Sequence, residues 1–441
     1  MNLLKKSRLG ELIEVTRGAS LSGEYYSTKG EYIRLTCGNF DYHNNCFKEN
    51  TSKDNLFYTG EFREEFLLEK GDIITPLTEQ AIGLLGTTAR IPKSGKYIQS
   101  QDIALVKCKA GKIDPTFCYY LISSRLVRNQ LSAAAQQTKI RHTSPDKIKD
   151  CTVWIPELDD QKAIGRLLAS LDEKIQLNKR INDNLEAMAK QLYDYWFVQF
   201  DFPNEDGKPY KSSGGTMVWN EKLKREIPQG WSNGVLSDVA NITMGQSPDG
   251  SSYNEDGEGI IFYQGSTDFG LRFPDIRQYT TSPSRYANKG DILMSVRAPV
   301  GALNIANNDC CIGRGLSALS SKIGSITHLY YLMNDFRLKF EGMNSAGTTF
   351  GSITKDELFS LPVIIPTKSV ISEFEQVCEP IFDKQMIIGE EINGLTKQRD
   401  ELLPLLMNGQ ATVNYHLSSQ NCFKESTNSA SISPIFSQNS A

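Results

Sequence analysis

The sequence lacks the motifs that mark most enzymes acting on nucleotides or DNA. It contains no Gly-x-x-x-x-Gly-Lys-Ser/Thr phosphate loop, which argues against an ATP-driven motor. It also contains no Asp/Asn-Pro-Pro-Tyr/Phe tetrapeptide of amino-methyltransferases and no convincing Pro-Asp…Glu-x-Lys nuclease core. Pro145 and Asp146 are followed by Lys147 and Lys149 but by no Glu-x-Lys, so we interpret them as a capped turn. We therefore expect no catalytic site in this chain.

Residues that bind metals are scarce, and long apolar runs are absent. Nine cysteines form no Cys-x-x-Cys pair and there are only four histidines, so we expect no zinc site. No apolar run approaches the roughly 20 residues that a membrane span requires, and residues 1–15 lack the apolar core of a signal peptide. These absences predict a cytoplasmic protein with reduced thiols and no membrane segment.

Charge of one sign is not in large excess, but it is unevenly distributed. The net charge of −4 does not indicate a general nucleic-acid binder, yet residues 1–150 hold 22 lysines and arginines against 17 acidic residues. This surplus would attract phosphate groups to the first part of the chain, whereas the acidic segment 367–441 would not.

What the sequence does contain is a long heptad pattern in residues 161–197, a stretch with no proline and one early glycine, Gly165. The pattern predicts a helix of about 55 Å that needs a partner helix. Its seam contains two asparagines, which would either fix the register of the helix pair or face solvent where the seam opens. The seam consists of Ile164, Leu168, Leu171, Ile175, Asn178, Asn182, Leu185, Ala189, Leu192 and Trp196.

The partner lies in a second copy of the whole pattern. A second seam follows the first at an offset of 210 residues and runs from Phe374 to Leu406, with Gln385 and Arg399 as polar members. Pro380 lies inside it, where we expect a kink or a broken start. Other motifs recur at offsets that fall from 227 to 210 along the chain: Leu9-Gly10-Glu11-Leu12 as Leu236-Ser237-Asp238-Val239, Lys70-Gly71-Asp72-Ile73 as Lys289-Gly290-Asp291-Ile292, Tyr119-Tyr120-Leu121 as Tyr330-Tyr331-Leu332, and Ile155-Pro156 as Ile365-Pro366.

The repeat predicts an α+β fold with two similar mixed α/β domains, separated by two long antiparallel coiled-coil helices. Within the first domain we expect strands at 72–74, 103–106 and 153–155 and one helix at about 115–131. The predicted segments are a first domain at 1–156, a helix at 157–200, a connector at 201–230, a second domain at 231–366, a second helix at 367–411, and a Ser- and Asn-rich, disordered tail at 412–441.

This arrangement resembles the specificity subunits of type I restriction-modification systems. The repeat, the Lys-Gly-Asp-Ile motifs and the Ile-Pro before each helix carry the resemblance, together with connector sequences at 191–197, 218–220 and 226–231. The resemblance implies two target-recognition domains, each reading one half of a bipartite asymmetric DNA target, and helices that set the spacer between the halves. It also implies a non-catalytic chain that binds double-stranded DNA, two methyltransferase subunits and restriction subunits. Those partners would use S-adenosylmethionine, ATP and Mg, and this chain would bind no cofactor.

Candidate DNA contacts lie in loops rich in side chains that read bases or hold phosphate. In each domain we select the loop after Lys-Gly-Asp-Ile and the loop before the closing strand. Tyr193, Trp196 and Phe197 are candidates either for docking a methyltransferase subunit or for covering the core. The predicted DNA-binding residues are Thr78, Gln80, Gln137, Lys139, Arg141, His142, Ser295, Arg297, Thr348 and Thr349.

Two other functions stay open on the sequence alone. A coiled-coil scaffold whose paired domains bind protein or carbohydrate ligands would show no sequence-dependent binding to DNA. A self-sufficient methyltransferase would be active with its cofactor and no other subunit, which we do not expect.

Overall fold

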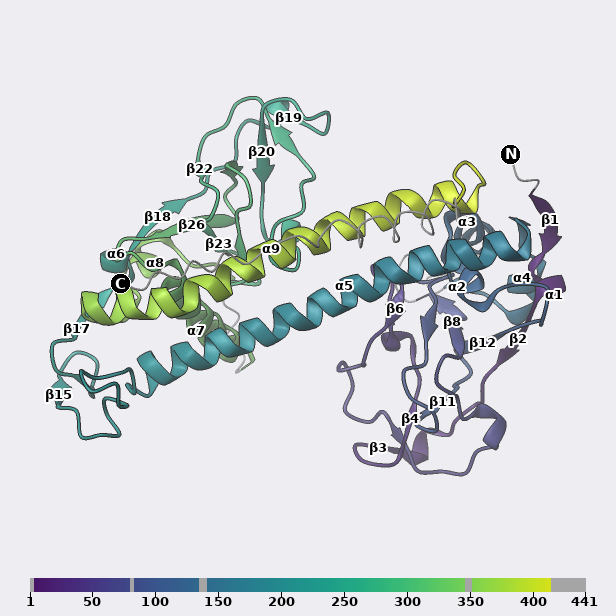
Figure 1. The fold of residues 1–441 in the computed structure, drawn as a ribbon, viewed down its shortest axis with the longest axis horizontal. Coiled ribbons are helices and arrows are strands. Elements are labelled where there is room, and N and C mark those ends of the chain that lie inside the picture. Colours follow the sequence, from purple (N-terminus) through teal and green to yellow (C-terminus); the bar gives the residue numbers. More distant parts are fainter. Residues whose placement is uncertain (1–3, 80–82, 135–140, 346–350, 414–441) are drawn as a thin grey trace, which may run out of the picture. The chain divides into compact units, whose positions relative to one another are not determined.

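The computed structural model describes residues 4–79, 83–134, 141–345 and 351–413. The chain forms two compact units, one from Met1–Ile175 with Leu395–Ala441 and one from Gln176–Gly394. The units therefore do not follow the linear order of the chain. Each takes its own part of two long helices, α5 (Leu158–Tyr193) and α9 (Lys368–Met407), which Figure 1 shows in blue and yellow-green.

The first unit is built on an antiparallel sheet in which alternate side chains enter two different cores. Ile73 and Val106 pack with the helices of the unit, whereas Ile74 and Leu105 pack on the opposite face of the sheet. This alternation follows from the two-residue period of a strand. The strand order is β10-β8-β12-β2, with bounds Ala89–Arg90, Ile73–Pro76, Ile103–Cys108 and Ile13–Arg17.

Smaller sheets complete the strands of the first unit. The outer sheet has the order β11-β4-β7-β3, in which only the β11–β4 pair is parallel. Its bounds are Tyr97–Ile98, Tyr32–Arg34, Phe57–Tyr58 and Tyr26–Ser27. Three two-stranded pairs join β1 (Lys5–Arg8) to β14 (Thr152–Ile155), β5 (Phe40–Asp41) to β6 (Cys46–Phe47), and β9 (Thr78–Glu79) to β13 (Arg141–His142).

Four short helices precede the long one: α1 (Leu9–Leu12), α2 (Pro115–Ser123), α3 (Arg125–Ala134) and α4 (Pro145–Asp150). The single helix predicted at 115–131 is wrong, because the chain is extended at Ser124 and separates α2 from α3. The Ser124 hydroxyl donates to the Leu121 carbonyl at 2.6 Å, and the Ser124 amide donates to the same carbonyl at 3.1 Å, so both groups close the end of α2. The capped turn expected at Pro145 is the start of α4, with Ser144 as its N-cap.

The second unit repeats this architecture. Its main sheet, β18-β26-β23-β24, has the strands Ala240–Met244, Leu316–Ser321, Ile292–Ser295 and Leu303–Ile305. Its second sheet, β19-β21-β20-β25-β22, has the strands Tyr253–Asn254, Tyr279–Thr280, Ile260–Tyr263, Cys310–Ile312 and Tyr286–Ala287. The pair β17–β27 (Ser232–Val235 and Pro362–Ile365) and the helices α6 (Leu236–Val239), α7 (Ile326–Ser345) and α8 (Lys355–Phe359) complete the copy. The connector adds a hairpin of β15 (Met217–Asn220) and β16 (Arg225–Pro228).

Helix α5 confirms the long helix predicted from the heptad pattern and continues into a π-helical segment, Asp194–Val198. In the second unit Asn178 bonds to Glu391 and Glu186 bonds to Gln385, so the numbering rises along α5 as it falls along α9 and the helices are antiparallel there. Helix α9 is fully described and continuous through Pro380, so the broken start that we allowed for is absent. The buried Cys378 and Phe382 on either side hold this turn against the core.

Candidate nucleic-acid interface

The two predicted loops of each domain lie next to one another. In the first domain β9 pairs with β13, and the amide of Thr143 donates to the Leu77 carbonyl at 2.8 Å. In the second domain Arg297 forms a bridge with Ser352, and the amide of Ile353 donates to the Val296 carbonyl at 3.0 Å. In both copies the loop after Lys-Gly-Asp-Ile is therefore paired with the segment that leads into a short helix, α4 in the first domain and α8 in the second.

Two predicted side chains in these loops face solvent. His142 and Arg297 are exposed, and Arg141 lies in β13 beside His142. These three positions carry the hydrogen-bond donors that contact base edges or phosphate in protein–DNA complexes. Five predicted residues lie outside the part of the chain that the structure describes: Gln80, Gln137, Lys139, Thr348 and Thr349.

Two predicted side chains instead face inward and hold the loops in shape. Thr78 is buried, and its hydroxyl donates to Asp102 Oδ1 at 3.1 Å and lies 3.4 Å from His142 Nδ1. Ser295 is also buried; its hydroxyl donates to the Pro299 carbonyl and accepts from the Ala302 amide at 2.9 Å. In this arrangement their role is to position the loops rather than to contact a ligand directly.

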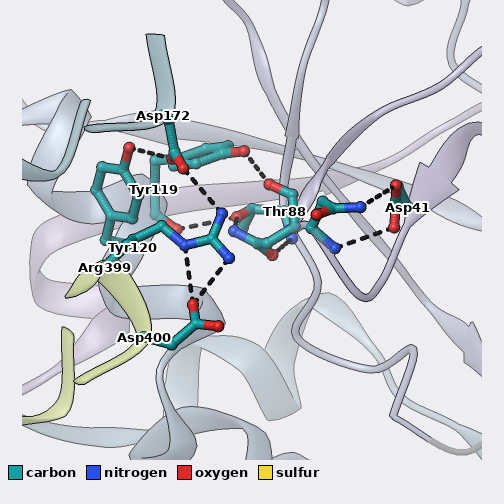
Figure 2. Close-up of polar contacts among 9 residues, drawn as sticks. Asp41, Thr88, Tyr119, Tyr120, Asp172, Arg399 and Asp400 are labelled. Carbon is teal, nitrogen blue, oxygen red and sulfur yellow. Dashed lines mark hydrogen bonds and ion pairs between the residues drawn. The ribbon is translucent and has the colours of Figure 1, made fainter. Parts of the chain in front are cut away.

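The sequence did not single out the β5–β6 hairpin, which is tied to α2 by a chain of hydrogen bonds (Figure 2). The Tyr119 hydroxyl donates to the Asn45 carbonyl, and Asn45 Nδ2 donates to Thr88 Oγ1 at 2.9 Å. Thr88 Oγ1 in turn donates to the Tyr119 carbonyl at 3.0 Å. Asn45 has a φ of 51°, a backbone conformation that asparagine tolerates better than most residues. The Asn44-Asn45 dipeptide was the available turn signal.

A buried polar triad joins the first domain to both long helices (Figure 2). The Tyr120 hydroxyl donates to Asp172 Oδ2 of α5 at 2.6 Å, and Arg399 Nη1 of α9 donates to Asp172 Oδ1 at 3.0 Å. Burial and the neighbouring Asp172 carboxylate raise the pKa of Tyr120, so the phenol stays protonated as a donor. Burial alone would lower the pKa of Arg399, but its bonds to Asp172 and Asp400 outweigh burial and raise it.

The second unit has a triad of different composition, at positions that are not equivalent to those of the first. Gln385 Nε2 of α9 donates to Glu186 Oε2 of α5 at 2.7 Å, and Arg272 of the domain bonds to both, at 3.1 Å and 3.4 Å. The Arg272 guanidinium also lies 4.8 Å from the centre of the Phe382 ring and 5.4 Å from that of Tyr330. Each domain is thus fixed to α5 and α9 through one charged side chain, Asp172 in the first unit and Arg272 in the second.

In each unit a carboxylate lies where the start of a domain helix meets a long helix. The domain supplies the carboxylate in the first unit, and the long helix supplies it in the second. In the first unit Asp114 caps α2, and a side chain at Gly165 of α5 would meet Asp114 Oδ1 at 3.2 Å. In the second unit Glu375 of α9 accepts from Ser325 and Thr327 at the start of α7. Gly165 and Glu375 are equivalent positions of the repeat. The acidic side chain is therefore the N-cap Asp114 in the first unit and the long-helix residue Glu375 in the second.

The aromatic residues at the end of α5 form part of the core of the second unit. Tyr193, Trp196 and Phe197 are each less than 7% exposed and pack with Phe374 of α9. Of the two roles considered for these residues, covering the core is the one the structure supports.

A family described as the type I restriction modification DNA specificity domain matches residues 1–187 and 228–386, one match in each half of the repeat. The chain belongs to this family. Among curated specificity subunits, the MjaX type I restriction enzyme subunit of Methanocaldococcus jannaschii is 30% identical over 328 residues, 72% of either chain. The HindI subunit of Haemophilus influenzae is 22% identical over 380 residues, covering 71% of this chain and 81% of that protein.

The S subunit of a type I restriction-modification system from M. genitalium shares the fold of this family member, with a TM-score of 0.58 at 16% identity. The match covers 92% of this chain and 96% of that one. The resemblance and the fold class inferred from the sequence are confirmed by the family match and this structural similarity.

The described part of the chain contains neither a metal-binding cluster nor a helix suited to cross a membrane. No group of three or more His, Cys, Asp or Glu side chains is placed to hold a metal ion in residues 4–79, 83–134, 141–345 and 351–413. Over the same ranges, no helix combines the length and apolar character needed to cross a membrane.

Proposed function

We propose that this chain is the DNA-specificity subunit of a type I restriction-modification complex, in which each domain reads one half of a bipartite target. The observation that carries the proposal is the repeated pairing of two loops in each domain, with exposed His142 in one copy and exposed Arg297 in the other. Two different readers in one chain correspond to two different half-sites, and their separation sets the spacer.

The proposed DNA contacts are residues of the paired loops. Arg141, His142 and Arg297 are the first choices, and Gln80, Gln137, Lys139, Thr348 and Thr349 stay predictions on loops outside the described residues. Thr78 and Ser295 support the loops from inside.

An exposed apolar stripe on α5 supports docking of a methyltransferase subunit. The stripe consists of Leu177, Ile181 and Met188 of α5 and Tyr195 of the π-helical segment that follows it. These residues follow one another at intervals of four and seven and are between 37% and 54% exposed. This spacing places them on one face of a helix, in the pattern that packs against another helix. Ile387, the repeat equivalent of Leu177, is 58% exposed on α9, which supports a second docking site and hence two methyltransferase subunits.

In the proposed complex the partners carry the chemistry. The methyltransferase subunits bring S-adenosylmethionine and methylate adenine, and restriction subunits use ATP and Mg to cleave. The support is family membership, because specificity subunits are generally non-catalytic.

Binding of the assembled complex to duplex DNA tests the function. The chain is combined with its methyltransferase subunits, and binding to a library of mixed-sequence duplexes is measured at several salt concentrations. We expect one bipartite sequence to be enriched, above a background that weakens steeply as salt rises. Equal retention of all sequences would refute the recognition function and favour a scaffold that binds other ligands.

Docking is tested separately by Met188→Glu, which puts a charge into the exposed stripe. We expect weaker co-purification with the methyltransferase subunit, while the unfolding midpoint of the chain stays unchanged. Lys397→Ala on an exposed turn of α9 is the control, because its side chain is 78% exposed and outside the stripe.

A further inference from the structure

Three polar contacts link α5 to α9, and in each of them the two helices contribute different chemical groups. One group of each contact is buried: Gln385 is fully buried, Asn178 is 6% exposed and Arg399 is 8% exposed. The facing carboxylates are partly exposed, with the Asp172 side chain at 26% and that of Glu186 at 34%. Buried groups of this kind destabilise a structure unless they are paired. The contacts are Asp172–Arg399 at 3.0 Å, Asn178–Glu391 at 2.9 Å and Glu186–Gln385 at 2.7 Å.

The internal repeat shows what these groups would meet if two copies of the chain paired like helix with like helix. Because α9 repeats α5 at an offset of 210 residues, each residue of α9 has a defined equivalent on α5. In a pair of two α5 helices, Asp172, Asn178 and Glu186 would face Ala189, Ile181 and Ile175 in place of Arg399, Glu391 and Gln385. In a pair of two α9 helices, Arg399, Glu391 and Gln385 would face Phe382, Ile388 and Thr396.

Five of these six substitute partners are apolar. In a pair of like helices none of the three carboxylates would keep its partner on the facing helix, and Arg399 would lose Asp172. Loss of Asp172 would be destabilising chiefly through Arg399, because this buried guanidinium would lose one of its two carboxylate partners.

We propose that these three contacts are specificity determinants that commit α5 to an α9 helix and exclude pairing with the like helix of a second copy. The polar residues act mainly by destabilising the wrong pairing, as a single polar residue does in a coiled coil. Asn178, one of the two seam asparagines of the sequence, belongs to this set.

The pairing rule has a consequence that rests on the proposed function, although the rule itself does not. A pair of like helices would bring together two copies of the same recognition domain, and the product would read a symmetric target. Excluding it keeps the asymmetric order of the two half-sites.

The test uses the full-length chain with α9 changed to what an α5 helix would present. Arg399→Ala with Glu391→Ile reproduces two of the three homotypic contacts; Gln385 is left unchanged because Arg272 also bonds to it. We expect the unfolding midpoint to fall by about 5 °C or more. The matched control is Lys397→Ala with Glu401→Ala, an exposed pair on the same helix, which should shift the midpoint by about 1 °C or less.

A rescue separates loss of pairing from general damage. Adding Asp172→Asn to Arg399→Ala removes the isolated charge and keeps an acceptor for the Tyr120 hydroxyl, so the midpoint should rise above that of Arg399→Ala alone. Its failure to rise, or a helix-mimicking variant as stable as the control, would overturn the proposal. If Arg399→Ala with Glu391→Ile does not fold, the unfolding midpoint of Asp172→Asn alone is measured instead. A lowered midpoint supports the proposal, and an unchanged midpoint overturns it. DNA binding is not measured, so these outcomes are independent of the proposed function.

Discussion

His328 makes the stability of the second unit depend on pH. The side chain is 2% exposed and packs against Phe197 and Tyr193, with ring centres 4.5 Å and 5.7 Å away. Its Nδ1 has no hydrogen-bond partner among the residues that the structure describes. Burial lowers the pKa of His328 to about 3, so the folded protein holds a neutral imidazole at every pH near neutrality.

The unfolded chain behaves differently, because a solvated histidine has a pKa of about 6.5. Between pH 6.5 and pH 3 the unfolded state therefore binds a proton that the folded state does not, and stability is lost as the pH falls through this window. From pH 7 to pH 5 the loss from this one group is about 2 kcal/mol.

The substitution His328→Phe isolates this contribution. Phenylalanine is the residue that the first copy of the repeat has at the equivalent position, Phe117, which is fully buried. Denaturant unfolding of the full chain is followed by tryptophan fluorescence, because Trp196 and Trp231 lie in the same core as His328's ring neighbours. We expect the wild type to lose about 2 kcal/mol more than the variant between pH 7 and pH 5. Parallel losses in the two proteins would refute a neutral buried imidazole.

Three further predictions concern the close contacts of the fold and its DNA loops. Gly245→Ala should lower the free energy of unfolding by about 1–3 kcal/mol, because a Cβ there would lie 2.2 Å from the Gly313 carbonyl oxygen. The control is Gly250→Ala, whose Cβ would meet no atom within 4 Å. Denaturant unfolding should show a change of at most about 0.5 kcal/mol for this variant. Gly165→Glu should destabilise the first unit by crowding the Asp114 carboxylate, and adding Asp114→Ser, which copies the arrangement of the second unit, should restore at least half of the lost midpoint. Arg297→Ala should weaken binding of the assembled complex by about 1–3 kcal/mol and relax the preference at one base position, without changing the unfolding midpoint.

Much of the architecture was predictable because the sequence contains an internal repeat, so each motif could be recognised in two copies. Heptad spacing located α5, and motifs such as Lys-Gly-Asp-Ile located the main strand of each domain. The structure has these as α5, β8 and β23. Asn178 was also open to analysis from spacing alone, and its bond to Glu391 supports the register role over the solvent role.

What could not be predicted depends on contacts between residues far apart in sequence. Helix propensity counts Gly389 as a weak point of α9, but in the structure its missing side chain leaves room for the buried ring of Phe273. Thr78 and Ser295 have the same polar character as exposed loop residues, and only the fold shows that both are buried. The bases that the proposed loops would read depend on side-chain geometry beside DNA, which residue types alone do not determine.

The composition of the first unit also affects how the protein is made. Leu406 and Met407 of α9 share a core with Ile164 and Leu168 of α5, so the first unit includes residues separated by more than two hundred positions of the chain. On the ribosome the first domain emerges early, yet it stays incomplete until translation passes the end of α9. Its apolar helix face is exposed throughout synthesis of the second domain, when such surfaces are prone to aggregate. A chain that stopped short of residue 395 would therefore damage the domain that was synthesised first.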